Sequence, residues 1–295
     1  MALRWVFITG ATSGIGRACA EHLASRGFGV VATGRNPQAL TELAERSRSS
    51  GWHLETLPLD VTSSEQVAAA AVAARALSGG AGIDVLVNNA GMGQAGFLAD
   101  LPTEKLRSQF EVSLFGLHAV TCALLPQLAS RAGIVINIGS IMGRMTTPWM
   151  GAYGAVKAAV RSLTETLRVE LGSLGVHVVL MEPGAVETAF HKRAIDGSVQ
   201  EVPAGSPYGG TYAWLAQNDY RPFFLMSAVS PLEVARLVER IVGRRRPKAR
   251  YVLPFAAHAL LLLMRLTPRV LMDPLKRRVF HLPRVSLQAP HPDRQ

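Results

Sequence analysis

Tyr153 and Lys157 have the side-chain types and the spacing that proton transfer requires. They stand four residues apart in a segment of helical character, so both project from one face of a helix. A phenol titrates near about pH 10 in water, and a neighbouring ammonium favours its ionised form, which suits it to act as an acid or a base. Most pairs of this kind are solvated helix surface, so the rest of the sequence must decide whether this pair does chemistry.

A glycine-rich turn near the amino terminus predicts a nucleotide site. Residues 9–16 read Thr-Gly-Ala-Thr-Ser-Gly-Ile-Gly, directly after an apolar run and directly before a helical segment. Glycines permit a tight bend and let the backbone approach a pyrophosphate, while the helix N-terminus offers free N–H groups and a positive dipole end. A glycine triplet alone could be a plain turn, but the strand, turn and helix in sequence favour nucleotide binding.

The second apolar run ends at Arg35, where a dinucleotide site distinguishes its two common cofactors. A carboxylate at this place binds the ribose 2′-hydroxyl of NAD, whereas an arginine favours the 2′-phosphate of NADP. No acidic residue lies between Val30 and Gln38. The sequence therefore predicts a preference for NADP(H), the alternative being that Arg35 is a solvated surface side chain.

Short apolar runs rich in Val and Ile alternate with longer helical segments, which is typical of a parallel sheet built from βαβ units. We expect a doubly wound α/β fold of the Rossmann type, with six to seven parallel strands in a single domain. The expected strands are 3–9, 29–33, 53–57, 83–88, 133–138, 176–181 and the short run 251–254. The expected helices are 15–26, 37–49, 63–78, 103–130, 152–172 and 231–243.

Composition excludes several classes of protein. The chain of 295 residues is 48% hydrophobic and 18% charged, which excludes a disordered chain, and it has too few cysteines for a disulfide scaffold. Cys19 and Cys122 are expected to be reduced core thiols, and no Cys/His cluster has the spacing of metal ligands. The first residues lack the pattern of a signal peptide, so we expect a cytoplasmic protein.

The formal net charge of +10 is concentrated in the C-terminal part of the chain. Residues 236–295 contain 14 Lys and Arg against 3 Asp and Glu, a net of +11, so the preceding part is almost neutral. Nucleic-acid binding would need such charge on a reading element with base-stacking aromatics, and the sequence suggests none.

An ordered set of motifs now resembles the classical short-chain dehydrogenase/reductase family. The resemblance covers about residues 3–190 and implies a nucleotide-binding domain over 1–253, followed by an extension over 254–295. The motifs are Thr9-Gly10-x-x-x-Gly14-x-Gly16, Asp60-Val61, Asn88-Asn89-Ala90-Gly91, Ser140, Tyr153-x-x-x-Lys157, and Pro183-Gly184 with Thr188.

The resemblance implies roles for these residues in an NADP(H)-dependent oxidoreductase. Tyr153 would exchange a proton with the substrate oxygen, Ser140 would donate a hydrogen bond to it, and Lys157 would hold the nicotinamide ribose and lower the tyrosine pKa. The residues expected to bind the cofactor are Gly10, Ser13, Gly14, Ile15, Gly16, Arg35, Asp60, Val61, Asn89, Ala90, Gly91, Tyr153, Lys157, Pro183, Gly184, Val186 and Thr188.

The sequence departs from the family at Ser113. The family has a catalytic Asn in a stretch similar to Phe110-Glu-Val-Ser113-Leu-Phe-Gly116, and a serine is shorter and lacks the amide. We expect reduced or retuned activity, and an Asn at position 113 to leave catalysis equal or better. The alternative is a catalytically weak or silent NADPH-binding protein.

The segment 189–230 has no clear period and is expected to form a substrate lid. Its aromatic residues, with the apolar side chains between Ser140 and Tyr153, predict a lipophilic carbonyl or alcohol substrate, such as a steroid, retinoid, long-chain or polyketide compound. Equally, these side chains could anchor a loop. A sugar or acyl-carrier substrate is a further alternative, because Arg144 and residues 191–193 could bind an anionic group. The side chains concerned are Met142, Met145, Trp149, Met150, Phe190, Tyr208, Tyr212, Trp214, Tyr220, Phe223, Phe224, Leu225 and Met226.

The extension over 254–295 is apolar and basic. Its apolar run 259–264 is far too short for a bilayer span, which needs about 20 residues. Apolar residues beside Arg265, Arg269 and residues 276–278 are typical of a peripheral contact with an anionic membrane, and a helical flap over the substrate mouth or against another subunit is the competing interpretation. The resemblance also implies a homodimer or homotetramer.

Overall fold

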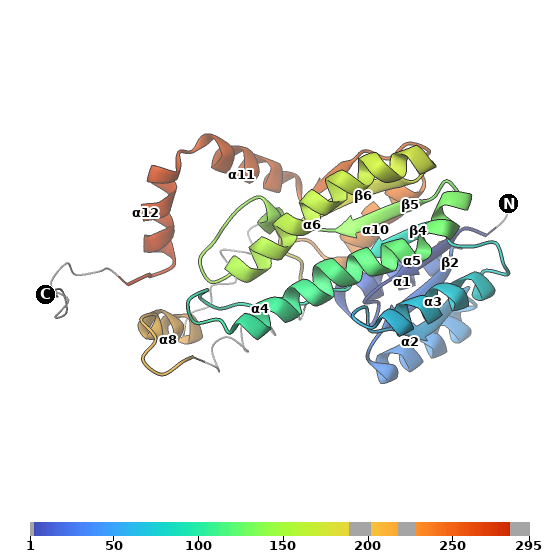
Figure 1. Ribbon diagram of the computed structural model, residues 1–295, viewed down its shortest axis with the longest axis horizontal. Coiled ribbons are helices and arrows are strands. Elements are labelled where there is room, and N and C mark those ends of the chain that lie inside the picture. The colour runs from blue at the N-terminus through green and yellow to red at the C-terminus, as the bar shows by residue number, and fades with distance from the viewer. Residues whose placement is uncertain (1–2, 189–201, 218–227, 284–295) are drawn as a thin grey trace, which may run out of the picture.

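The computed structural model describes residues 3–188, 202–217 and 228–283. Seven strands form one fully parallel sheet in the order β3-β2-β1-β4-β5-β6-β7 (Figure 1). The expected doubly wound α/β fold is confirmed, including the short seventh strand. The strands are β1 (Trp5–Ile8), β2 (Gly29–Gly34), β3 (Leu54–Pro58), β4 (Val85–Asn88), β5 (Ile134–Ile138), β6 (His177–Pro183) and β7 (Arg250–Leu253).

Helices cover both faces of this sheet. The helices α1, α2 and α10 pack on one face, and α3, α5 and α6 pack on the other. The helices are α1 (Gly14–Ser25), α2 (Pro37–Ser50), α3 (Ser64–Leu77), α4 (Thr103–Phe110), α5 (Gly116–Ser130), α6 (Gly151–Glu170), α8 (Gly209–Gln217), α10 (Pro231–Val242), α11 (Phe255–Leu266) and α12 (Arg269–Val279).

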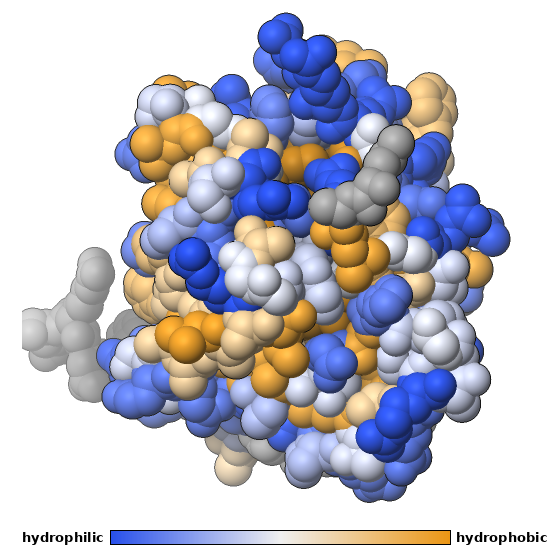
Figure 2. All heavy atoms as spheres, turned by 90° about the vertical axis from the view of Figure 1, so that its right-hand side faces the viewer, coloured by the Kyte–Doolittle hydropathy of each residue, from blue (hydrophilic) through white to orange (hydrophobic). Residues whose placement is uncertain are grey.

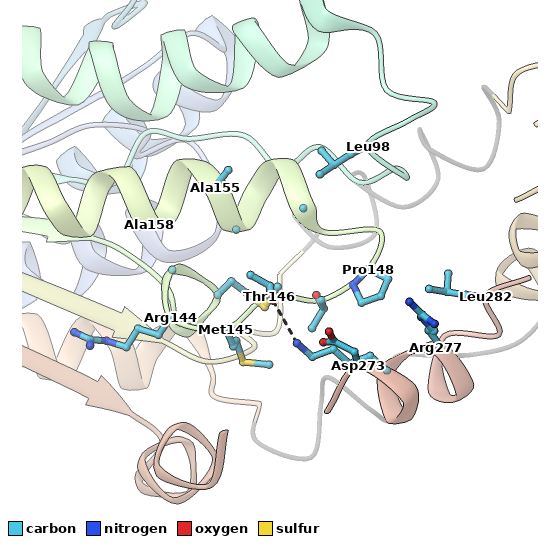
Figure 3. A pocket seen from close by; sticks show the side chains of 16 residues that line it. Leu98, Arg144, Met145, Thr146, Pro148, Ala155, Ala158, Asp273, Arg277 and Leu282 are labelled. Carbon is cyan, nitrogen blue, oxygen red and sulfur yellow. Dashed lines mark hydrogen bonds between the residues drawn. The ribbon is translucent and has the colours of Figure 1, made fainter. Parts of the chain in front are cut away.

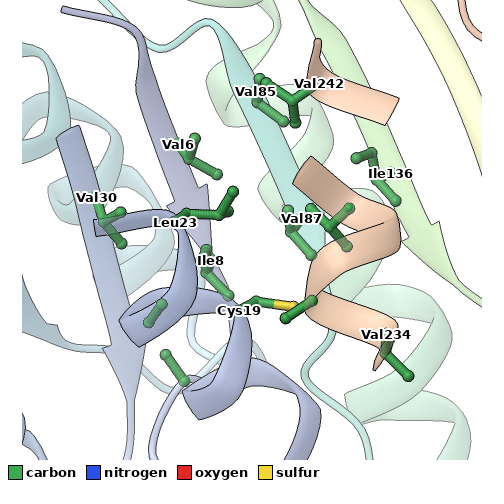
Figure 4. Packing of buried hydrophobic residues seen from close by; sticks show 14 of the residues in the cluster. Val6, Ile8, Cys19, Leu23, Val30, Val85, Val87, Ile136, Val234 and Val242 are labelled. Carbon is green, nitrogen blue, oxygen red and sulfur yellow. The ribbon is translucent and has the colours of Figure 1, made fainter. Parts of the chain in front are cut away.

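The strands are buried on both sides, which explains their continuous apolar runs. Along β1, Val6 and Ile8 join the core under α1 and α10, while Phe7 points into the core under α3 and α5. Figure 4 shows the first of these cores, with the strand valines facing Cys19 and Leu23 of α1. Such a core, closed by helices on both faces, holds the strand ends in fixed positions.

Only one of the two thiols lies in the core. Burial raises the pKa of Cys19 to about 12, so this thiol stays protonated among the apolar side chains. Cys122 is exposed on α5, so the expectation of a core position was wrong for this residue. Its place on the outer side of the helix explains the difference.

Local sequence fixes several helix ends. Asn36 caps α2 by accepting the N–H of Ala39, and Ser230 forms a capping box with Glu233 at the start of α10. Pro231 occupies the first turn of α10, as predicted, where its missing N–H costs no helical bond.

The expected helix 103–130 has an internal irregularity. A π-helical segment, Glu111–Phe115, separates α4 from α5 without breaking the helical path. The whole stretch Thr103–Ser130 is long and apolar enough to cross a membrane by length and composition, but α5 packs against α3 and β4 as a core helix. It is thus an element of the fold.

The carboxyl ends of the strands point toward α4, α8 and α12, on the left of Figure 1. Figure 2 shows the other end of the molecule, where hydrophilic side chains surround smaller apolar patches. The sequence-predicted site residues lie at the carboxyl ends, the edge at which open parallel sheets bind ligands.

Candidate functional site

Thr9 organises the glycine-rich turn after β1. Its buried Oγ1 accepts the N–H groups of Asn89 and Ala90, both at 2.9 Å, which joins the ends of β1 and β4. The Asn89 amide donates back to the carbonyls of Thr9 and Gly10 at 3.0 and 3.1 Å. These bonds hold the turn and the loop after β4 together as one rigid unit.

The glycines in this turn are required by close contacts. A Cβ on Gly16 would lie 2.2 Å from the carbonyl oxygen of Gly10, so only glycine lets α1 start this close to the turn. Gly10 and Gly14 have positive φ values of 67° and 54°, which glycine adopts without strain.

The start of α1 fits a bound pyrophosphate. Ser13 precedes the helix in an extended conformation, and its side chain makes no capping bond within the described part of the chain. The first N–H groups of α1 are therefore available to an anion. A Cβ on Gly14 would come within 3.2 Å of the Thr188 side chain, so Thr188 closes over the same turn.

Arg35 and Asp60 stand together at the ends of β2 and β3. The Arg35 guanidinium is exposed and lies 3.6 Å from a carboxylate oxygen of Asp60. Hydrogen bonds from Thr62 and the nearby Arg35 hold the pKa of Asp60 below its ordinary value. Val61 is buried against Gly116 of α5, so it shapes the wall beside these charges.

Ser140, Tyr153 and Lys157 meet just beyond the carboxyl end of β5. Tyr153 lies in the first turn of α6 and forms a side-chain hydrogen bond with Ser140. The Ser140 Oγ also accepts the N–H of Met142 at 3.2 Å. Lys157, one turn further along α6, has its Nζ 5.7 Å from the centre of the Tyr153 ring and donates to the Ile138 carbonyl at 2.7 Å.

Burial controls the titration of these groups. Desolvation raises the pKa of Tyr153 to about 12, against a smaller lowering by its hydrogen bond to Ser140. Desolvation also lowers the pKa of Lys157 to about 8. In the described residues, burial thus outweighs the lowering of the tyrosine pKa expected from Lys157, and the phenol is protonated at neutral pH.

Ser113 lies in the π-helical segment between α4 and α5. It is buried, and its Oγ accepts the N–H of Met92 at 3.4 Å. Gln109 donates to the Met92 carbonyl, also at 3.4 Å. Ser113 therefore supports the loop that follows Gly91.

A buried chain of polar side chains supports the site and was missed in the sequence. The Asn88 amide donates to Thr121 and to Asn137, each at 2.9 Å, and Asn137 donates to Thr164 at 3.0 Å. This chain of hydrogen bonds connects β4 and β5 to α5 and to α6, the helix that carries Tyr153. Polar residues inside the apolar runs 83–88 and 133–138 were the available signal.

The segment after β6 runs next to the glycine turn. Gly184 donates its N–H to the Leu253 carbonyl at 2.7 Å, and Val186 pairs with Val229. The structure thus brings all the expected cofactor residues to one edge of the sheet, from the turn at Gly10 to Thr188.

The described part of the expected lid contains a helix, α8, that the sequence did not predict. Tyr208 stacks on Phe97 with ring centres 4.2 Å apart, and the Tyr212 hydroxyl accepts the Phe97 N–H at 3.2 Å. Trp214 stacks on His281 of the C-terminal extension at 4.1 Å. These aromatics anchor the segment, as the alternative interpretation held, and Tyr212 packs in the same cluster as Tyr153. Phe190, Tyr220, Phe223, Phe224, Leu225 and Met226 lie outside the described residues.

A cavity of about 510 Å³ opens between α6, the 141–148 segment and α12 (Figure 3). Its walls include Met142 and Met145, together with Leu98 and Leu282. Lys276 of α12 reaches across to the Thr146 hydroxyl at 3.3 Å. Tyr153 is not among its described lining residues, so the cavity lies on the flank of α6 beside the site. Met142 belongs to the cluster that contains Tyr153 and also lines the cavity, and Met145 and Leu282 pack against that cluster from the cavity wall.

Arg144 does not present a free charge to this cavity. Its Nε donates to both carboxylate oxygens of Glu182 at 2.8 Å, and Glu182 is 1% exposed. Arg250 adds a second guanidinium 3.6 Å from the same carboxylate. The suggestion that Arg144 serves an anionic substrate group is therefore not supported by its contacts, and residues 191–193 lie outside the described residues.

The glycine-rich turn at the start of α1 and the Ser140, Tyr153 and Lys157 side chains beyond the end of β5 thus lie at the same edge of the sheet. The model of the short chain dehydrogenase family matches residues 4–198. The chain belongs to the short-chain dehydrogenase/reductase family, whose members act on small carbonyl and alcohol substrates and are commonly oligomeric.

Individual relatives agree with this assignment. The chain is 35% identical over 265 residues to an NADPH-dependent 3-dehydrocapnine reductase of Ornithobacterium rhinotracheale, covering 85% of this chain and 88% of that protein. A short-chain dehydrogenase from Streptomyces avermitilis superimposes with a TM-score of 0.76 at 29% identity, covering 96% of this chain and all of the other. A short-chain dehydrogenase/reductase from Burkholderia phymatum in complex with NAD gives 0.75 at 28% identity, covering 88% and 92%.

Proposed function

We propose that this protein is an NADP(H)-dependent oxidoreductase that interconverts a lipophilic carbonyl compound and its alcohol. The observation that carries the proposal is the hydrogen bond between Tyr153 and Ser140, with Lys157 one helical turn away. This arrangement gives the substrate oxygen a proton donor and a second hydrogen-bond donor from the same side.

The proton chemistry follows from the protonated phenol. Tyr153 gives its proton to the carbonyl oxygen, and the Ser140 hydroxyl donates a hydrogen bond to the negative charge that develops there. When bound, the nicotinamide supplies the hydride that the carbonyl carbon receives. One N–H of the Lys157 ammonium donates to the Ile138 carbonyl, and its other N–H groups would hold the nicotinamide ribose. In the reverse direction Tyr153 accepts the proton.

Arg35 supports the choice of NADP(H). It stands at the end of β2 with its guanidinium exposed, where it would bind the 2′-phosphate of the cofactor. The relative from Ornithobacterium rhinotracheale is named as NADPH-dependent. The nearby Asp60 carboxylate would then orient the Arg35 guanidinium toward the phosphate.

Apolar side chains support the lipophilic substrate. Tyr153 packs in a cluster with Met142, Trp149, Met150 and Tyr212. The cavity beside it has apolar walls from α6 and the 141–148 segment, and charged side chains of α12 close its other side. Area burial against the apolar walls would hold a hydrophobic compound. We further propose, from the family alone, that the protein forms a homodimer or homotetramer.

The test is NADPH oxidation over a panel of lipophilic ketones and aldehydes, with NADH in parallel. We expect Tyr153→Phe to lower kcat by about 100- to 10,000-fold, because the phenylalanine keeps the packing and removes the proton donor. NADPH affinity, measured by fluorescence titration, should change little. Arg35→Ser should raise KM for NADPH by about tenfold and leave KM for NADH unaltered.

Tyr251→Phe is the matched control, since this half-buried tyrosine of β7 uses its hydroxyl only to accept the Lys248 N–H among its described bonds. It should keep wild-type turnover. Full activity of Tyr153→Phe would refute the assigned proton donor. Tight NADPH binding without turnover by the wild type would favour the silent binder, and Ser113→Asn would then show whether chemistry can be restored.

A further inference from the structure

Helix α11 turns an apolar face to solvent. Phe255 is 86% exposed and Leu266 71% exposed, and Leu262 and Leu263 between them are also exposed. Their spacing of seven, eight and eleven residues from Phe255 places all four on one side of the helix. The opposite side, which includes the buried Ala257, packs toward β7.

Helix α12 also turns apolar side chains to solvent. Its charged residues Asp273, Lys276 and Arg277 face the protein, where they line the cavity beside α6 (Figure 3). Leu271 is 64% exposed, and Leu275, four residues further on, is exposed on the same side. A helix of a globular protein normally buries its apolar face, so this orientation calls for something to cover it.

The two faces are bordered by positive charge. Between Phe255 and the end of the described chain at residue 283, the sequence has five Lys and Arg and a single acidic residue. Arg265 and Arg269 flank the bend between α11 and α12, and Arg278 lies one turn after Leu275 on the same side of α12. Apolar side chains with flanking cations match the chemistry of a membrane surface that carries anionic lipids.

We propose that α11 and α12 form a docking surface for an anionic lipid bilayer. The helices have 12 and 11 residues, too short to span a membrane, so they would lie in its interface with their apolar faces in the acyl region. Figure 1 shows both helices at the periphery of the molecule, joined at a bend and apart from most of the sheet. The residues directly after α12 are anchored, because Phe280 is buried and the His281 carbonyl accepts the Thr211 hydroxyl at 2.8 Å.

Charge favours a bilayer over a second copy of this chain. A two-fold contact would place the same positively charged surface against itself, with few carboxylates to balance Arg265, Arg269 and Arg278. An anionic membrane supplies the missing negative charge.

The surface also has a consequence that rests on the proposed function. Since α12 carries its apolar residues on one side and lines the cavity with the other, docking would hold the cavity about one helix diameter, about 10 Å, from the membrane surface. A lipophilic substrate that leaves the bilayer would then have a short path to the cavity beside the site.

The test is cosedimentation of the full-length protein with vesicles, in the absence of substrate and cofactor. One set contains phosphatidylcholine alone and the other about one third phosphatidylglycerol. We expect binding to the anionic vesicles that weakens at high ionic strength. Leu262→Ser combined with Leu266→Ser should lower the partition coefficient about tenfold or more, because two apolar anchors are lost.

Val169→Ser is the matched control, because Val169 is 67% exposed on α6, outside this surface. It should bind vesicles as the wild type does, and so should Tyr153→Phe, which separates docking from catalysis. Absence of binding to both vesicle types would overturn the proposal, as would an equal loss of binding in Val169→Ser. If the double serine variant converts a dimer to a monomer in sedimentation velocity and binds vesicles normally, the surface belongs to a subunit contact instead.

Discussion

Replacing Arg144 by methionine should destabilise the protein without a specific effect on substrate binding. The Arg144 guanidinium makes two contacts of 2.8 Å with Glu182, a carboxylate at the end of β6 with 1% exposure. Methionine fills a similar volume but leaves the carboxylate in the protein interior with only Arg250 nearby, at 3.6 Å. The buried charge then loses its principal partner.

The magnitude follows from the burial of this pair. Removal of one partner of a buried ion pair costs about 3–5 kcal/mol, and because the contact with Arg250 remains, we expect a loss of about 3 kcal/mol. For a chain of this size, about 2 °C of Tm per kcal/mol gives a decrease of about 6 °C. Differential scanning fluorimetry and urea unfolding would measure it. Adding Glu182→Gln to Arg144→Met should recover part of the loss, since a neutral amide is easier to bury than an unpaired carboxylate.

Arg161→Met gives the comparison at a partly exposed pair. Arg161 lies 3.6 Å from Glu165 on the surface of α6, where solvent screens the charges, so the change in stability should stay below about 1 kcal/mol. The reasoning fails if Arg144→Met keeps the wild-type Tm and instead raises KM for an anionic substrate. Arg144 would then be a ligand of the substrate rather than a support of the loop before α6.

Two further predictions concern the cofactor turn and the buried lysine. Gly16→Ala should weaken NADPH binding by about tenfold or more and destabilise the fold by about 1–3 kcal/mol, because its Cβ would lie 2.2 Å from the Gly10 carbonyl oxygen. The control is Gly172→Ala, which should have little effect on either, because no described atom lies within 4 Å of its Cβ. Normal titration of NADPH by Gly16→Ala would contradict the expected close contact. The pKa of Lys157 falls from 10.5 to about 8 on folding, so the unfolded chain binds more protons than the folded chain between these pH values. The free energy of unfolding should therefore rise with pH from about 8 upward, and this contribution is lost as the pH falls through about 8. Lys157→Met should flatten the rise in unfolding curves measured at pH 8 to 9.5, and an unaltered slope would show that another group causes it.

The sheet could be predicted from sequence because its signal is local. A strand buried on both faces needs an unbroken apolar run, and runs such as 133–138 are visible without any knowledge of their neighbours. The glycine turn and the Tyr153–Lys157 pair are also local, since their function depends on spacings of a few residues.

Other features depend on contacts between distant parts of the chain. The Arg144–Glu182 pair joins residues 38 positions apart, and no local pattern marks either as a partner of the other. Helix α8 has no apolar period, because its buried residues Tyr212 and Leu215 pack in a small cluster with Phe97 and the C-terminal extension rather than against a continuous core. Periodicity cannot show such an element.

The protonation state of Tyr153 depends on burial as well as on the spacing of the motif. A tyrosine and a lysine one helical turn apart predict a phenol with a lowered pKa if the ammonium faces it in water. In the folded protein the Lys157 ammonium donates to the Ile138 carbonyl and lies 5.7 Å from the ring centre, while both side chains are desolvated. Desolvation opposes both charged forms, so the chain alone keeps Tyr153 protonated and poised to donate. That state suits reduction of a carbonyl, and it predicts that the oxidative direction gains most from alkaline pH, because only there does the phenol lose its proton.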